Sequence, residues 1–428
     1  MGEDVKIQKH RFLAKMAWIG ISLGLMAGGM VSAIQIFPGF GAQGAIFLRS
    51  IFGNDLVARL EELVLLAQDK ADMARYSLGI SRPAAPWQAP SSPASDEKEI
   101  PSAPRVETTV IPPPPPEPIQ KINPTPESTP AVQATLTPTP QPTVTSTPNT
   151  WVLAAVPPLG KLEGEGQWSV YLKDRVGRPV AYRTFLQPDA KRPYTLLGVV
   201  AFNLERSNLR YVLGSVEPNT YKLQLPGTIP PIDRKAGKLL AVFNGGFMAT
   251  HGKYGAMSNG IEPLPPRDAV GTVVIYQDGR VAIGEWGKDI HPSQDMVAWR
   301  QNCPPIIRAG QIHAKVEKNL IEDWGGTLDG EVVTWRSGLG ISKDGKVLYF
   351  FAGPRLSMPV MAQAMTLVGV HNAIQLDINS YWVHFSAVKE EKGELIADPL
   401  FPEEMKVHKE RFLNPSTRDF FYITLKEW

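Results

Sequence analysis

Residues 357–377 read SMPVMAQAMTLVGVHNAIQLD, and this stretch decides how the carboxy-terminal part of the chain folds. Ser357 can cap a helix, a proline two residues later suits the first turn, and an apolar face follows. Gly369 is predicted to end the helix, and a strand is predicted to begin at Ala373. The stretch therefore predicts a helix followed closely by a buried strand that ends near Asp377.

Other short apolar or alternating runs predict the strands around this unit. They are residues 196–202, 239–243, 273–276, 281–285, 338–341, 347–351 and 420–425. Two turns that contain Asp-Gly, at 277–280 and 342–346, are predicted to join neighbouring strands as hairpins. Many short strands, without a regular alternation with helices, predict an α+β (mixed α/β) fold in which the sheet dominates. We expect a single globular domain over residues 159–428.

The amino-terminal residues predict a membrane segment. Basic side chains precede a run from Met16 to Leu48 that contains no charged residue. We predict a cytoplasmic tail at 1–12 and a transmembrane signal anchor at 13–37, which is long enough to span a ~30 Å hydrocarbon core. A cleavable signal peptide is the alternative, because residues 31–33 read Val-Ser-Ala. Both interpretations place the remaining chain outside the cytoplasm.

Two segments separate this anchor from the globular domain. Residues 38–81 are predicted to form a juxtamembrane helical segment, with apolar residues at helical spacing between Ile51 and Tyr76. That helix could associate with itself or a partner, or rest on the membrane or the domain. Residues 82–158 hold 21 of the 40 prolines in the chain and predict a disordered linker. The linker could be a glycosylated stalk or a bare spacer.

Bulk composition excludes some classes of partner and site. Lys and Arg number 44 against 42 Asp and Glu, which gives a net charge of +2 and does not indicate a nucleic-acid partner. Cys303 is the one cysteine, so the chain cannot form an intramolecular disulfide or a cysteine-based zinc cluster.

Three polar motifs are candidates for chemistry. Asn244-Gly245-Gly246-Phe247 follows a predicted strand, and its amides and Asn side chain could hold a phosphate or a sugar hydroxyl, or form a plain tight turn. Thr334-Trp335-Arg336-Ser337-Gly338 presents a guanidinium that could pair with an anion or with a surface carboxylate. In residues 373–382, strand periodicity places four polar side chains on one face: Gln375, Asp377, Asn379 and Tyr381. Asp377 could be a base, a nucleophile or a metal ligand, or it could cap a turn.

The order of these motifs resembles the phosphodiester glycosidase family, which includes the lysosomal uncovering enzyme and many bacterial exported proteins. The resemblance covers most of residues 202–425 and includes WRQNCPP at 299–305. It implies hydrolysis of a sugar-1-phosphodiester at the anomeric carbon. One departure is that bulky side chains follow Asp377, where the family has a glycine-rich run. The pocket is then either reshaped for another substrate or inactive.

The resemblance also suggests roles for individual residues. The implied catalytic residues are Asp377, Arg336 and Asn244. The implied substrate-binding residues are Gly245, Gly246, Asn379, Ser337 and His251. The expected partners are a carbohydrate or cell-envelope glycan and, through the amino-terminal helix, a membrane. No cofactor is assigned, and participation of a divalent cation is left open.

Two further hypotheses compete with the hydrolase. A non-catalytic domain that binds glycans would also suit display on a stalk, and loss of the glycine-rich run favours it. A structural membrane scaffold acting through the helix at 51–76 would leave the polar motifs unexplained.

Overall fold

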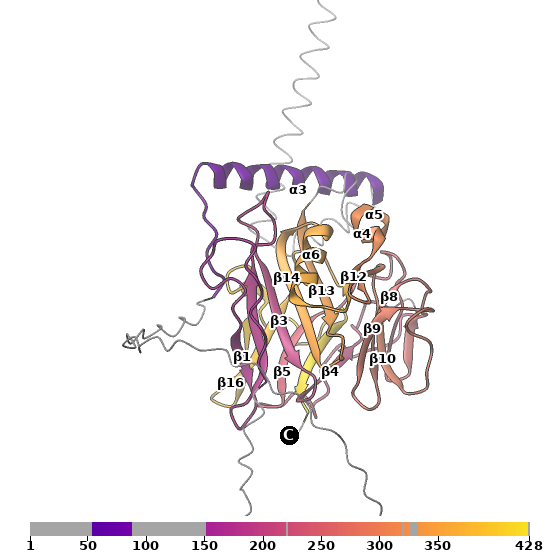
Figure 1. Ribbon diagram of the computed structural model, residues 1–428. Coiled ribbons are helices and arrows are strands. Elements are labelled where there is room, and N and C mark those ends of the chain that lie inside the picture. The colour runs from indigo at the N-terminus through magenta and orange to yellow at the C-terminus, as the bar shows by residue number, and fades with distance from the viewer. Residues whose placement is uncertain (1–53, 88–150, 220, 319–320, 325–332, 427–428) are drawn as a thin grey trace, which may run out of the picture. The chain divides into compact units, whose positions relative to one another are not determined.

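The computed structural model describes residues 54–87, 151–219, 221–318, 321–324 and 333–426. The strands form three sheets, and every neighbouring pair of described strands is antiparallel (Figure 1). This architecture confirms the predicted sheet-dominated mixed fold.

The first sheet has eight strands in the order β1-β2-β3-β14-β13-β15-β11-β12. Their bounds are β1 (Ser169–Lys173), β2 (Pro179–Leu186), β3 (Leu197–Asn203), β14 (Val347–Leu356), β13 (Thr334–Ile341), β15 (Asn372–Gln375), β11 (Pro305–Arg308) and β12 (Gln311–Ile312). The central strand β3 is buried along its whole length, as its continuous apolar sequence requires.

The other two sheets have five strands each. One has the order β17-β16-β5-β18-β4, and the other β7-β6-β10-β8-β9. The bounds in the former are β17 (Glu394–Pro399), β16 (Phe385–Glu391), β5 (Leu239–Asn244), β18 (Phe420–Leu425) and β4 (Ser207–Val212). Those in the latter are β7 (Ile261–Leu264), β6 (Ala256–Ser258), β10 (Met296–Gln301), β8 (Gly271–Tyr276) and β9 (Val281–Glu285).

Aromatic side chains join the eight-stranded sheet to the sheet that contains β5. Phe243 of β5 lies 4.9 Å from Phe350 of β14 between ring centroids, and Phe385 of β16 lies 5.1 Å from Phe350. All three are fully buried in the largest apolar cluster. Because this packing fixes β5 and β18 against β13 and β14, it also fixes the loops at their ends, where the polar motifs lie.

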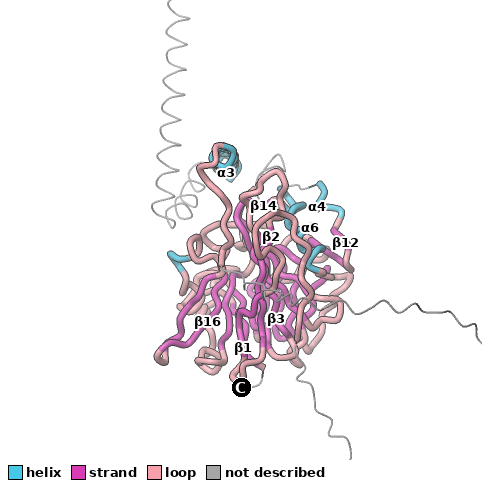
Figure 2. The backbone as a smooth tube through the Cα atoms, turned by 60° about the vertical axis from the view of Figure 1, so that its left-hand side comes forward, coloured by secondary structure: helices cyan, strands magenta, loops and turns pink. Residues whose placement is uncertain are grey.

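Helix α6 (Met358–Val368) covers the opposite face of the eight-stranded sheet with buried methionines, and the helix and β16 lie on opposite sides of the sheet in Figure 2. Ser357 caps it by accepting from the Val360 amide, and Gly369 ends it in a left-handed conformation with φ of 90°. These features confirm the predicted helix and its two ends. The remaining short helices are α4 (Ala314–Lys318), α5 (Ile321–Trp324) and the 3-10 helix η1 (Lys406–His408).

The strand predicted to begin at Ala373 ends two residues before Asp377. β15 ends at Gln375, and the chain then turns, so the predicted alternation of polar side chains along one strand face is wrong. The turn begins because the Asp377 carboxylate accepts hydrogen bonds from the next two backbone amides, which competes with strand pairing.

Residues before the predicted start of the domain pack against it. Helix α3 (Asn54–Ser77) confirms the predicted helix, and its Asp69 pairs with Arg192 at 2.7 Å. The indole of Trp87 is 9% exposed and lies 5.8 Å from the Phe185 ring in the main core. Trp151 also contacts the domain, because its carbonyl accepts a hydrogen bond from the Tyr182 hydroxyl of β2.

The predicted single-pass membrane protein, with a cytoplasmic amino terminus and an extracytoplasmic domain, is corrected by the structure. Within the described ranges, no helix combines the length and the apolar character needed to cross a membrane. The predicted anchor at 13–37 and most of the predicted linker, residues 88–150, lie outside the described residues.

Candidate active site

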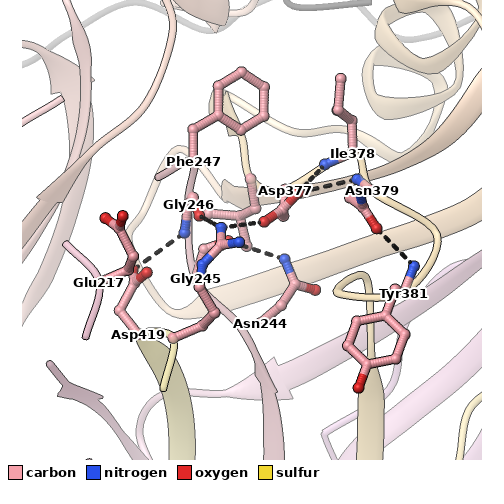
Figure 3. A network of polar contacts seen from close by, with 12 residues as sticks. Glu217, Asn244, Gly245, Gly246, Phe247, Asp377, Ile378, Asn379, Tyr381 and Asp419 are labelled. Atoms are coloured by element: carbon pink, nitrogen blue, oxygen red, sulfur yellow. Dashed lines mark hydrogen bonds and ion pairs between the residues drawn. The ribbon is translucent and has the colours of Figure 1, made fainter. Parts of the chain in front are cut away.

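Three segments that are distant in sequence meet at one end of the β5 sheet. They are the Asn244–Phe247 loop after β5, the turn that begins at Asp377 after β15, and the Arg418-Asp419 pair before β18 (Figure 3). The antiparallel pairing of β5 with β18 brings Asn244 opposite Phe420, which places Asp419 beside the loop.

The Asp377 carboxylate is held by three donors. Its Oδ1 accepts from the amides of Ile378 at 2.8 Å and Asn379 at 2.9 Å, and its Oδ2 accepts from Arg418 Nη2 at 2.5 Å. Both side chains of the ion pair are 7% exposed. Charge-assisted hydrogen bonds of this kind are short and strong, so the carboxylate has one fixed position.

Arg418 links this carboxylate to the Asn244–Phe247 loop, here called the glycine loop. The same Nη2 atom donates to the Gly246 carbonyl at 2.9 Å. The guanidinium also lies 4.9 Å from the centre of the Trp382 ring, at the far end of the turn that begins at Asp377. One buried side chain therefore positions the loop, the carboxylate and the turn together.

The two glycines are required by space. A Cβ on Gly245 would lie 2.1 Å from Asp419 Oδ2, and a Cβ on Gly246 would lie 2.9 Å from the Arg300 guanidinium. Their amides are already used, because Gly245 donates to the Asp419 carbonyl at 3.0 Å and Gly246 to its Oδ2 at 3.2 Å. The two amides of the predicted cradle thus bind Asp419, one at its backbone carbonyl and one at its carboxylate.

Asp419 and Arg300 form a fully buried ion pair beneath the loop. Arg300 Nε lies 2.8 Å from Asp419 Oδ2, and the side chains are 0% and 1% exposed. The same oxygen accepts from the Tyr211 hydroxyl at 3.0 Å, and burial next to Asp419 raises the pKa of Tyr211 well above its usual range. Arg300 also donates to the Phe247 carbonyl. The pair therefore fixes both ends of the Gly-Gly sequence.

Arg336 and Ser337 are buried, and their hydrogen bonds support the segment around Asp377. Arg336 is 2% exposed and donates to the Leu356 carbonyl at 2.9 Å and to Gln375 Oε1 at 2.6 Å, and burial lowers its pKa to about 10. Ser337 Oγ donates to the Asp377 carbonyl at 2.7 Å. Arg336 therefore donates from two of its nitrogens, and Ser337 from its hydroxyl, to groups within the protein.

Of the other predicted site residues, one is buried and two lie on the surface. Asn244 is buried and donates to Ser337 Oγ and to the Gly245 carbonyl, both at 2.9 Å. Asn379 is exposed, and its Oδ1 accepts from the Tyr381 amide at 2.9 Å, which holds the turn (Figure 3). His251 lies in an exposed turn whose amide donates to Met248. Asn244 and Asn379 join the network around Asp377.

A cavity of about 470 Å³ opens beside this network. Its walls include Tyr381 and Trp382 on one side, and on the other His408, Arg411 and residues 414–417. The cavity therefore lies between the turn after Asp377 and the segment that leads to Arg418.

Sequence reasoning did not find Arg418, Asp419 or Arg411. The one available signal was an Arg-Asp pair directly before the predicted terminal strand at 420–425. Within the described ranges, no three His, Cys, Asp or Glu side chains gather as metal ligands.

A comparison with protein families identifies this part of the chain. Residues 237–377 match the family model described as phosphodiester glycosidase. This segment is a phosphodiester glycosidase domain. It begins just before β5 and ends at Asp377, so it contains the glycine loop, Arg300 and Arg336. The resemblance predicted from the sequence motifs is confirmed.

Solved structures match the chain at low sequence identity. A structure of the zebrafish N-acetylglucosamine-1-phosphodiester alpha-N-acetylglucosaminidase catalytic domain, auto-inhibited by its pro-peptide, is 15% identical with a TM-score of 0.38. The match covers 61% of this chain and 88% of the zebrafish chain. A hypothetical protein from Synechocystis is 11% identical with a TM-score of 0.29, covering 54% of this chain and 59% of its own. No curated protein matches the chain.

Proposed function

We propose that this protein hydrolyses sugar-1-phosphodiesters by breaking the bond between the anomeric carbon and the phosphate oxygen. Water adds to the anomeric carbon, the bonding electrons leave with the phosphate, and the products are a free sugar and a phosphomonoester. The family match supports the reaction class, since phosphodiester glycosidases are hydrolases. The observation that carries the proposal is the buried ion pair between Asp377 and Arg418, in which Arg418 also donates to the Gly246 carbonyl of the glycine loop.

The leaving group explains why a single carboxylate suffices as the central group. A phosphomonoester has a second pKa near ~6, so it leaves the anomeric carbon with little help from a general acid. Positive charge develops on the sugar as the bond breaks, and a fixed negative charge nearby stabilises it. Asp377 provides such a charge at a position set by three hydrogen bonds.

The hydrogen-bond count of Asp377 leaves it one site for chemistry. A carboxylate offers about four lone-pair positions. Two on Oδ1 are used by the amides of Ile378 and Asn379, and one on Oδ2 by Arg418. The remaining position can accept a proton from the attacking water or hold a sugar hydroxyl. We assign Asp377 this role, and Arg418 the role of positioning it.

A second candidate is a domain that binds glycans without cleaving them. The observation that favours it is that the Gly245 and Gly246 amides donate to Asp419 and are not free for a phosphate. In this case Asp377 and the cavity would bind a sugar, and no product would form.

The two candidates are separated by an activity assay on the full chain. Release of phosphomonoester would be measured over a panel of sugar-1-phosphodiesters, with Asp377→Asn as the test variant. Asp289→Asn is a matched control, because Asp289 pairs with Arg308 at 2.6 Å on the exposed surface. We expect Asp377→Asn to lower kcat by ~10²–10⁴-fold and Asp289→Asn to leave it unchanged. Turnover that survives Asp377→Asn would contradict the assignment, and saturable glycan binding without turnover would favour the second candidate.

A further inference from the structure

The cavity beside Asp377 carries a guanidinium whose donors are not all used. Arg411 lines the cavity, and its Nη1 is buried without a hydrogen-bond partner in the described part of the chain. The buried Nε of Arg418 is likewise without a partner there. Buried polar atoms in native proteins are nearly always satisfied by protein, water or a ligand. An unsatisfied guanidinium donor in the wall of this cavity therefore indicates that something polar binds there.

The faces of two aromatic rings hold Arg411. Its guanidinium carbon lies 3.9 Å from the centre of the Tyr381 ring and 4.5 Å from that of Trp382. Tyr381 is itself held edge-on against His408, with ring centroids 4.9 Å apart. A cation–π contact uses the face of the ring and leaves the in-plane N–H groups free. Tyr381 and Trp382 thus position Arg411, and its Nη1 keeps a donor for a ligand.

The local charge favours an anion. Arg411 and Arg418 both lie near a single carboxylate, Asp377, which forms its ion pair with Arg418. In the described part of the chain, no carboxylate lies within ion-pair distance of Arg411. Burial, together with the charge of Arg418, lowers the pKa of Arg411 to about 10, so the guanidinium stays charged at neutral pH. A half-buried cation without a paired carboxylate is unfavourable, and a bound anion would remove that cost.

The rim of the cavity does not cancel this charge. Lys406 and Lys409 contribute two further cations, and Glu410 contributes one carboxylate. Lys406 is paired with Glu403 at 2.7 Å, with both side chains exposed, so its contribution is largely neutralised. His408 is held towards its neutral form, because burial and then the charge of Arg411 lower its pKa. The excess positive charge is therefore that of Arg411.

We propose that this cavity, here called the Arg411 subsite, binds the phosphate group of the substrate, with Arg411 Nη1 donating to one of its oxygens. The inference rests on the proposed function and deepens it. It assigns the anion contact to Arg411, whereas the sequence motif suggested Arg336, whose guanidinium already donates to Leu356 and Gln375. A volume of about 470 Å³ is large enough for a phosphate and the first group esterified to it.

Binding of inorganic phosphate and of methyl phosphate to the full chain tests the subsite directly, by isothermal titration calorimetry at low ionic strength. Arg411→Gln is the test variant. Arg280→Gln is the matched control, because Arg280 also stacks on a tyrosine, 3.8 Å from the Tyr276 ring, but lies on the exposed surface. We expect Arg411→Gln to weaken binding at least tenfold and Arg280→Gln to leave it unchanged. Equal affinity in Arg411→Gln, or no binding to the wild type, would overturn the proposal.

Two further variants keep the outcome interpretable. If Arg411→Gln does not fold, Arg411→Lys replaces it, which keeps the charge but loses the planar fork and is expected to bind more weakly than the wild type. Unchanged binding in a folded Arg411→Lys would count against the subsite. Asp377→Asn removes the neighbouring negative charge, so it is expected to bind phosphate at least as tightly as the wild type while losing turnover.

The same variants separate failure of the subsite from failure of the proposed function. Wild-type turnover with an unchanged KM in Arg411→Gln would overturn the Arg411 subsite and leave the glycosidase intact. Phosphate binding that needs Arg411, without turnover of any sugar-1-phosphodiester, would leave the subsite intact and overturn the glycosidase.

Discussion

Replacing Asp419 with Asn removes one charge from the buried pair beneath the glycine loop and keeps the shape of the side chain. Asp419 Oδ2 accepts from Arg300, Tyr211 and Gly246 at 2.8, 3.0 and 3.2 Å, and an Asn oxygen can accept from the same donors. What changes is that Arg300, which is 0% exposed, loses its counterion. Breaking a buried pair by removing one charge costs about 3–5 kcal/mol. With an m-value of about 3 kcal/mol per M, the urea midpoint should fall by about 1–1.7 M.

The assay is urea unfolding of the full chain followed by tryptophan fluorescence. Glu205→Gln is the control, because Glu205 pairs with Lys346 on the open surface, where the side chains are 56% and 57% exposed, and its midpoint should not move. A midpoint for Asp419→Asn within error of the control would refute the argument that this pair holds the glycine loop.

Three further predictions follow from neighbouring contacts. Gly245→Ala should lower the free energy of unfolding by about 1–3 kcal/mol, because its Cβ would lie 2.1 Å from Asp419 Oδ2, and thermal unfolding would show an unchanged Tm if the contact were absent. Burial lowers the pKa of His384 to about 3 from 6.5, so the unfolded chain binds more protons between these values and stability should fall as the pH is lowered through that window. Urea midpoints across pH should show a shallower loss in His384→Gln, and an equal slope would contradict this. Trp87→Ala should cost about 3–5 kcal/mol, measured by urea unfolding, if the segment before the linker is part of the folded unit. A cost below about 1 kcal/mol would show that it is not.

The sequence predicted the elements whose signals are local. The helix at 358–368 was readable because its cap, its apolar face and its terminal Gly369 lie within one stretch. The strand before Asn244 was readable because six consecutive buried positions in β5 are apolar apart from the last. Local signals of this kind gave the motifs of the site and the family, since both are carried by short segments.

The sequence could not predict which atoms the motifs would contact. Arg418 lies 41 residues after Asp377, and the two meet only because β18 pairs with β5. Arg336 resembled a free anion ligand because nothing near it in sequence shows that Gln375, 39 residues later, accepts its hydrogen bond. The end of β15 was also misjudged, since strand alternation continues in the sequence beyond the point where the Asp377 side chain starts a turn. Contacts between distant segments thus decide which polar groups remain free for a ligand.

The most direct test of the account is to follow which bond breaks. A sugar-1-phosphodiester would be hydrolysed by the full chain in oxygen-18-labelled water, and both products would be analysed by mass spectrometry. Cleavage at the anomeric carbon, with Asp377 beside it, predicts that the label enters the sugar and that Asp377→Asn abolishes its incorporation. Label found in the phosphomonoester would mean that water attacks phosphorus, which would contradict the glycosidase mechanism.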